Sequence, residues 1–184
     1  MKVFINPGHK PGLDSGAVNP NSGMQEADVA LAIGTLVKQY LEDAGVECEF
    51  LQSNSLNGED EDEDNPSICR TANESGADIF VSIHCNAANT EAQGTEVEVY
   101  SYSSDEANRL AQCIQNQIVG ALGTVDRGLK ERPNLAVLRN TDMPAVLVET
   151  AFIDNDADAE LLANNQDDFA RAIARGVTDY EGGC

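Results

Sequence analysis

A chain of 184 residues with 41% hydrophobic residues can bury a core of one ordinary domain, which excludes an intrinsically disordered protein despite a formal net charge of −21. This charge repels phosphate backbones and anionic lipid surfaces, so we expect no nucleic-acid partner. Apolar runs are all far shorter than the roughly 20 residues of a transmembrane helix, so we expect no membrane span.

The N-terminus briefly resembles an export signal. Residues 1–5 are basic and then apolar, but Asn6-Pro7-Gly8 ends the apolar run after three residues. We therefore expect no export signal in this chain. Three origins stay open: a cytosolic protein, a protein released by lysis, or a domain excised from a longer exported protein.

Short apolar segments alternate with amphipathic ones along the whole chain. We expect strands over 2–6, 46–51, 79–83, 95–100, 135–138 and 146–148. We expect helices over 26–44, 66–74, 105–122 and 167–180. No linker divides the sequence. The alternation predicts a single α/β domain, 1–184, with a mostly parallel twisted sheet and helices on both faces.

Local signals mark where the helices begin. Ser22 and Gln25 form a possible capping box before the first helix, and Pro66 suits the first position of the second. The acidic run 59–64 suggests calcium, but a calcium-hand loop starting at Asp60 finds Asn65 and Thr71 where Gly and Glu are needed. We expect 53–65 to be a solvated loop. The run 154–158 fails the same test and is interpreted as a capped helix start.

Five cysteines are scattered and form no C-x-x-C pair: Cys48, Cys69, Cys85, Cys113 and Cys184. An odd, scattered set in a chain of this length predicts reduced thiols that are mostly buried as small apolar residues. Cys184 follows two glycines at the end of the chain, so we expect it to be exposed and unpaired.

Polar residues follow three of the expected strands. His9 and His84 are the only histidines, and Glu149 follows the apolar run 145–148. Ligands of open parallel sheets bind at the carboxyl ends of the strands, so these side chains should share one edge. The two histidines also have an interpretation without a metal, because a lone histidine after a strand is usually a capped or core residue.

Glu26 precedes Val29 and Ala30 by three and four residues, so it lies on the apolar face of the first helix. A carboxylate there is costly unless it is paired or metal-bound, although the helix dipole also favours it. Two imidazoles and one carboxylate leave a tetrahedral zinc one open position, as in catalytic sites.

Five segments in order resemble the zinc-dependent N-acetylmuramoyl-L-alanine amidases of the amidase-3 family: NPGHKPGLDSGA at 6–17, RTANESGADIFVSIHCNA at 70–87, GTEVEVY at 94–100, DRGLK at 126–130 and MPAVLVETAFIDN at 143–155. The resemblance implies zinc ligands His9, Glu26 and His84, one Zn²⁺ per chain, and Glu149 as the catalytic carboxylate. It implies hydrolysis of the amide between the lactyl group of N-acetylmuramic acid and L-alanine of the stem peptide.

The same resemblance implies a peptidoglycan substrate and action at the cell wall, and we expect a monomer. The family more often has Asp at Asn6 and Gly at Ala151, and the acidic loop replaces its usual Arg and Asp after the second strand. Two alternatives stay open. A zinc peptidase acting on peptide ends would need an arginine near the site, and a silent wall-binding domain would not turn over.

Overall fold

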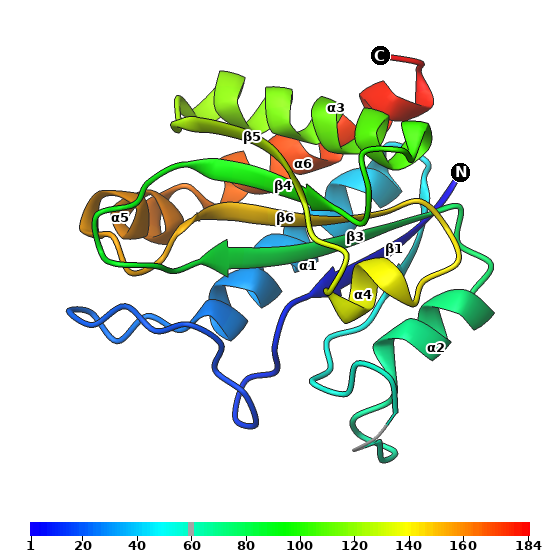
Figure 1. The fold of residues 1–184 in the computed structure, drawn as a ribbon, viewed down its shortest axis with the longest axis horizontal. Coiled ribbons are helices and arrows are strands. Elements are labelled where there is room, and N and C mark those ends of the chain that lie inside the picture. The colour runs from blue at the N-terminus through cyan, green and yellow to red at the C-terminus, as the bar shows by residue number, and fades with distance from the viewer. Residues whose placement is uncertain (59–60) are drawn as a thin grey trace.

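Residues 1–58 and 61–184 are described by a computed structural model, in which helices cover both faces of one sheet (Figure 1). The elements in chain order are β1 Lys2–Pro7, α1 Glu26–Asp43, β2 Glu47–Phe50, α2 Ile68–Glu74, β3 Ile79–Asn86, β4 Thr95–Val99, α3 Asp105–Leu122, β5 Asp126–Glu131, α4 Ala136–Arg139, β6 Ala145–Phe152, α5 Asp156–Asn164 and α6 Gln166–Glu181.

The sheet has the strand order β2-β1-β3-β6-β4-β5. Neighbouring strands run parallel except β4 and β6, which pair antiparallel. The central strands are apolar on both faces, as parallel strands buried between helices must be. In β1, for example, Val3, Phe4 and Ile5 are at most 1% exposed. The expected α/β class with a mostly parallel sheet is confirmed.

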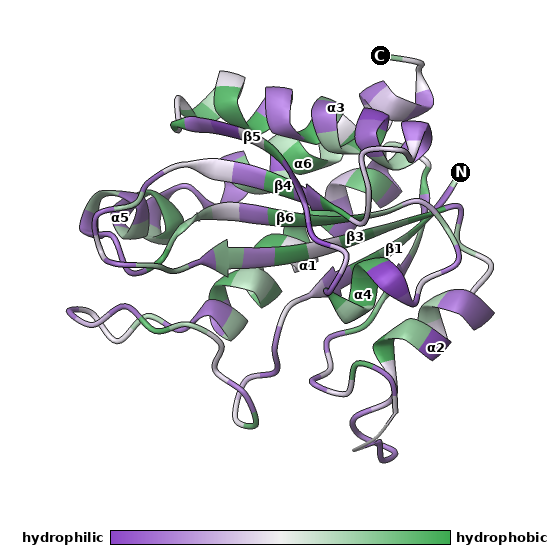
Figure 2. Cartoon of the chain, viewed as in Figure 1, coloured by the Kyte–Doolittle hydropathy of each residue, from purple (hydrophilic) through white to green (hydrophobic). Residues whose placement is uncertain are grey.

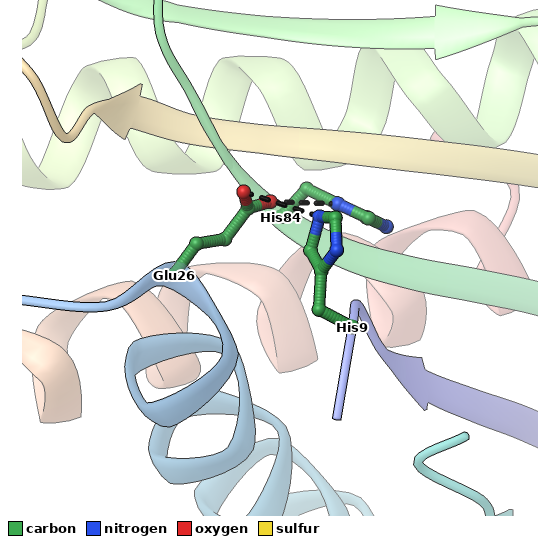
Figure 3. A group of neighbouring side chains, drawn as sticks. All are labelled: His9, Glu26 and His84. Carbon is green, nitrogen blue, oxygen red and sulfur yellow. Dashed lines mark hydrogen bonds and ion pairs between the residues drawn. The ribbon is translucent and has the colours of Figure 1, made fainter. Parts of the chain in front are cut away.

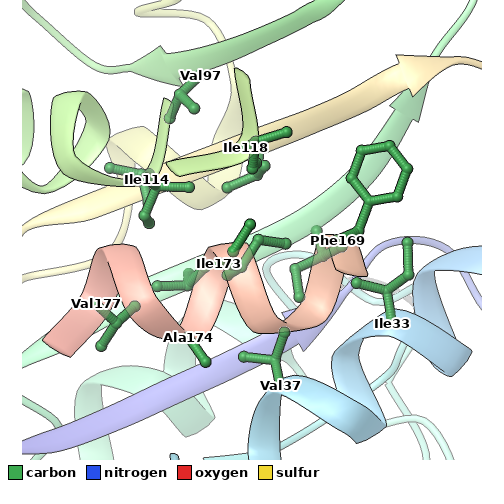
Figure 4. Close-up of a cluster of buried hydrophobic side chains, with 14 of the residues drawn as sticks. Ile33, Val37, Val97, Ile114, Ile118, Phe169, Ile173, Ala174 and Val177 are labelled. Atoms are coloured by element: carbon green, nitrogen blue, oxygen red, sulfur yellow. The ribbon is translucent and has the colours of Figure 1, made fainter. Parts of the chain in front are cut away.

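Two hydrophobic clusters hold the layers together. The larger one packs α1, α3 and α6 against one face of the sheet, where Ile33, Ile114 and Ile173 are fully buried (Figure 4). The smaller one packs α2 and α4 against the other face through residues such as Ile68 and Val137. Figure 2 shows hydrophobic colour along much of the central strands β1 and β3 and mostly hydrophilic colour along the edge strand β5.

One element prediction is wrong, and one strand was not predicted. Residues 136–139 form the short helix α4, because a four-residue apolar run has no periodicity of its own and here packs Val137 and Leu138 into the smaller cluster. The strand β5 was not expected, because its sequence DRGLKE is polar and contains Gly128. β5 lies at the edge of the sheet, and an edge strand can be polar because it is not buried on both of its faces.

Two helix starts also differ from expectation. The first amides of α1 bond the carbonyls of Ala17 and Ser15, so a fold-back of the preceding loop replaces the expected capping box of Ser22. The second helix begins at Ile68, and the Ser67 hydroxyl accepts from the Arg70 amide. The helix start expected at 154–158 is confirmed, since the Asn155 side chain caps α5.

The expectation that all cysteines are reduced is wrong, because Cys113 and Cys184 form a disulfide. Helix α6 packs on α3, and the chain that leaves α6 returns the C-terminus to α3, with the two Cα atoms 6.6 Å apart. This proximity is tertiary, so no local spacing could reveal it. Cys48, Cys69 and Cys85 are free.

The loop expected over 53–65 is present in its described part, although Ser53 and Ser55 are buried and not solvated. Glu59 and Asp60, which begin the acidic run, lie outside the described residues. Across the described ranges no helix is long and apolar enough to cross a membrane.

Candidate active site

Three segments meet at the carboxyl ends of β1 and β3. His9 follows β1, Glu26 is the first residue of α1, and His84 lies inside β3, which extends further than expected (Figure 3). One ligand atom from each residue lies within 4.8 Å of the others. Two imidazoles and a carboxylate arranged in this way fit the ligand set of a catalytic zinc site.

The Glu26 carboxylate lies at the centre of this group. Its Oε1 is 2.8 Å from His84 Nδ1 and accepts from the Cys85 amide at 3.1 Å. Its Oε2 is 3.2 Å from His9 Nε2 and accepts from the Ala17 amide at 2.8 Å. The buried charge is therefore compensated on both oxygens, as a carboxylate in this position requires.

Small residues make room for the imidazoles. A Cβ at Gly8 would collide with the His84 ring, and a Cβ at Gly16 would collide with Glu26 and His9. His9 itself has a φ of 59°, a left-handed conformation that is uncommon outside glycine and often occurs at functional sites. The Gly-rich loop thus allows the three side chains to approach one another.

Asp14 is a site residue that the sequence analysis missed. Its Oδ2 is 2.7 Å from His9 Nδ1, so the second ring nitrogen is held while Nε2 faces Glu26. A carboxylate on the outer nitrogen of a metal-binding histidine fixes the tautomer and orientation of the ring. An acidic residue five positions after a histidine in a tight loop was the available signal.

Charge interactions shift the pKa values of this group. Hydrogen bonds to Glu26 and Asp14 raise the pKa of His9 to about 9, although burial opposes the shift. Burial would raise the pKa of Glu26, but the hydrogen bonds from His84 and His9 outweigh it and hold this pKa well below its usual range. The site therefore favours a charged Glu26 carboxylate beside a protonated His9.

Glu149 lies on β6 directly opposite His84 in the parallel ladder, so the two side chains share a face. Its Oε2 is buried and has no hydrogen-bond partner among residues 1–58 and 61–184. Burial raises the pKa of Glu149 well above its ordinary value, and the carboxylates of Glu26, Glu98 and Glu96 raise it further. Such a carboxylate has high proton affinity beside the candidate metal ligands.

A cleft of about 180 Å³ opens beside the two histidines. Its remaining walls come from the loop after β2, from α2 and α4, and from β6; they include Asn54, Leu56, Ile68, Val137 and Leu147. A substrate bound there would reach His9 and His84 from the face of the sheet that α2 and α4 cover.

The family model described as N-acetylmuramoyl-L-alanine amidase matches residues 3–179. This chain belongs to that amidase family. The protein YqiI of Bacillus subtilis (strain 168) is 38% identical over 97% of this chain and 84% of its own length. The N-acetylmuramoyl-L-alanine amidase LytC of the same strain is 36% identical over 97% of this chain but only 35% of its own length.

The amidase fold is also found among solved structures. A crystal structure of N-acetylmuramoyl-L-alanine amidase from Clostridium difficile 630 has a TM-score of 0.85 at 32% identity, covering 100% of this chain and 97% of that one. The amidase AmiC2 of Nostoc punctiforme gives 0.83 at 32% identity, covering 99% and 97%. This chain thus corresponds to nearly the whole length of those solved chains and to about a third of LytC.

Proposed function

We propose that this amidase hydrolyses the bond between the lactyl group of N-acetylmuramic acid and L-alanine of the peptidoglycan stem peptide. In this proposal, His9, Glu26 and His84 hold one Zn²⁺, Glu149 is the catalytic carboxylate, and residues 1–184 act as one monomeric catalytic domain. The observation that carries it is the convergence of three ligand atoms within 4.8 Å beside an unpaired carboxylate, in a chain of this family.

In the proposed reaction, the zinc ion, Glu149 and Asp14 have separate roles. A zinc ion, when bound, lowers the pKa of a coordinated water and polarises the scissile carbonyl. Glu149 takes the proton of the attacking water and gives it to the departing alanine nitrogen. Asp14 holds Nδ1 of His9 and so keeps Nε2 directed at the metal position.

The peptidase alternative needs an arginine free to bind a peptide terminus. Four arginines are candidates: Arg127 and Arg132 contact Glu96, Arg70 contacts Glu61, and Arg139 donates to the neutral side chain of Asn140. Three of the four are therefore held by carboxylates, and Arg139 is the one whose substitution tests the peptidase alternative. A silent wall-binding domain would not need an unpaired, buried Glu149 oxygen.

The disulfide supports action outside the reducing cytosol. Disulfides form and persist mainly in oxidising compartments, and the Cys113–Cys184 bond would be reduced in most cytosols. We therefore propose that the enzyme works at the cell wall, as its substrate requires.

Two measurements test the proposal. Digested peptidoglycan should gain free amino groups belonging to L-alanine with no matching gain in reducing sugar ends; the reverse result would indicate a glycosidase. The protein should contain about one zinc per chain. His84→Ala should lose zinc and activity together, and normal zinc content in that variant would contradict the ligand assignment.

The variant Glu149→Gln distinguishes a role of Glu149 as the general base from a role as a zinc ligand. It keeps the shape of the side chain but cannot take a proton, so turnover should fall by at least about a hundredfold while zinc content stays normal. If zinc is lost as well, Glu149 is a ligand and not the base.

A further inference from the structure

Acidic side chains form a row across the sheet next to the site. Glu149 on β6 has His84 of β3 directly opposite on one side and Glu96 of β4 directly opposite on the other. Residues opposite each other in a ladder share a face, and like charges in this arrangement are destabilising. The Glu149–Glu96 pair therefore costs stability, and something must compensate for it or make use of it.

Two arginines lie at the outer edge of this row. Arg127 Nε donates to Glu96 Oε2 at 2.7 Å, and the Arg127 guanidinium stacks 4.8 Å from the centroid of the Phe152 ring. Arg132 lies 3.7 Å from Glu96 Oε1 through Nη2 and 3.0 Å from Glu98 Oε1 through Nε. Both guanidinium groups are thus held by carboxylates of β4.

Glu96 is fixed in turn by its surroundings. It is 2% exposed, and its Oε1 accepts from the Asn86 amide group at 3.1 Å. With Arg127 on Oε2, each oxygen of Glu96 has a partner. Glu149 is the opposite case, because its buried Oε2 has no partner in the part of the chain that the structure describes.

This contrast matters for catalysis. Charge-assisted bonds between arginine and a carboxylate are among the strongest hydrogen bonds in proteins. A guanidinium bound to a carboxylate favours its charged form and lowers its pKa, so it weakens that carboxylate as a proton acceptor. Arg127 and Arg132 are near enough to Glu96 to pair with it, and Glu96 is the next residue in the row after Glu149.

We infer that Glu96 is a positioning residue for Glu149: by binding Arg127 and Arg132, it keeps both guanidinium groups from pairing with Glu149. The inference rests on the proposed role of Glu149. Glu98 assists by holding Arg132. The repulsion between Glu96 and Glu149 is then the energetic cost of an unpaired catalytic carboxylate.

A purely structural role for Glu96 makes the opposite prediction. Neutralising Glu96 would remove its repulsion of Glu149 and should leave catalysis unharmed or improved. Neutralisation also removes the part of the raised pKa of Glu149 that Glu96 causes, but that loss is expected whichever arginine is present; a loss caused by a released arginine that binds Glu149 disappears when that arginine is removed. Removing that arginine as well should therefore restore activity, whereas a packing defect would become worse with a second change.

The test uses the zinc-loaded full chain on a soluble muramoyl peptide. Glu96→Gln keeps the side-chain shape and should lower kcat at least about tenfold, part of the hundred- to ten-thousand-fold that a general base contributes, with KM unchanged. Zinc content should equal that of the wild type. Glu96→Gln combined with Arg127→Gln, or with Arg132→Gln, should recover most of the lost kcat, and the better pair identifies the interfering cation.

Two results would overturn the inference: a Glu96→Gln variant with normal kcat, or a loss that neither double variant relieves. If Glu96→Gln does not fold, Glu98→Gln removes the nearer of the two carboxylates that hold Arg132 and leaves Arg127 in place, and its combination with Arg132→Gln carries the same comparison. A wild-type chain that leaves the muramoyl–alanine bond intact would refute the proposed function instead, so the two failures are distinguishable.

Discussion

Replacing Gly16 by alanine should damage the metal site while leaving the fold nearly as stable as in a matched control. Gly16 has a φ of 63° and Gly12, in the same loop, a φ of 83°. Alanine at either position costs roughly 1–2 kcal/mol for the left-handed conformation. Only at Gly16 does the new Cβ meet the site, 2.5 Å from Glu26 Oε2 and 2.6 Å from His9 Cδ2.

The size of the effect follows from these contacts. The side chains must retreat by about 0.5 Å to reach 3.0 Å, whereas distances in a metal site tolerate deviations of only about 0.2 Å. We expect zinc affinity to fall by about 10- to 100-fold, as when an outer partner of a metal ligand is lost. That corresponds to about 1.4–2.8 kcal/mol of binding free energy.

The assay is a zinc titration of both variants against a competing chelator, with melting temperatures measured in the absence of metal as the control for backbone strain. Gly12→Ala should keep the wild-type zinc affinity, since nothing lies within 4 Å of its Cβ. Equal zinc affinity in the two variants would refute the steric argument.

Three further predictions concern stability. Gly176→Ala in α6 should destabilise, because its Cβ would lie 2.5 Å from the Ile114 Cα and overpacking of about 1–3 kcal/mol exceeds the gain of about 1 kcal/mol in helix propensity. Gly120→Ala in α3, which has open space around the new Cβ, should raise the free energy of unfolding by about 1 kcal/mol, the gain in helix propensity. If urea unfolding finds Gly176→Ala more stable than Gly120→Ala, the packing argument is wrong. Cys184→Ser should cost about 2–4 kcal/mol, because the disulfide closes a loop between residues 71 apart; a melting temperature indifferent to reductant would argue against the bond. Since a net charge of −21 repels itself, raising the salt to about 1 M should raise the melting temperature, and no response would mean that the repulsion is negligible.

The sequence was most informative where periodicity is strong. The long helices α1, α3 and α6 and the apolar strands β1 and β3 lie close to their predicted positions, because their side chains face a core at regular intervals. The errors fall on short or polar elements. The run 135–138 has too few residues to show a period, and β5 is a polar edge strand stabilised by its partner β4.

The site residues that could be predicted from the sequence are those that come at the ends of apolar runs. His9, His84 and Glu149 each follow or end an apolar run, which a single sequence displays. The contact of Asp14 with His9 and the pairing of Glu96 with Arg127 depend on loop closure and on neighbouring strands. The disulfide depends in the same way on the packing of α6 against α3. These relations exist only in three dimensions.

The hydrogen bonds around Glu26 have a consequence for how the site is loaded. With a pKa of about 9, His9 carries a proton at neutral pH before a metal binds. Capture of a cation must therefore expel that proton into the buffer, and apparent affinity should weaken about tenfold for each unit that the pH falls below 9. The pH of the surroundings would thus set the fraction of enzyme molecules that hold a metal ion. The proton and the metal compete for the same His9 side chain.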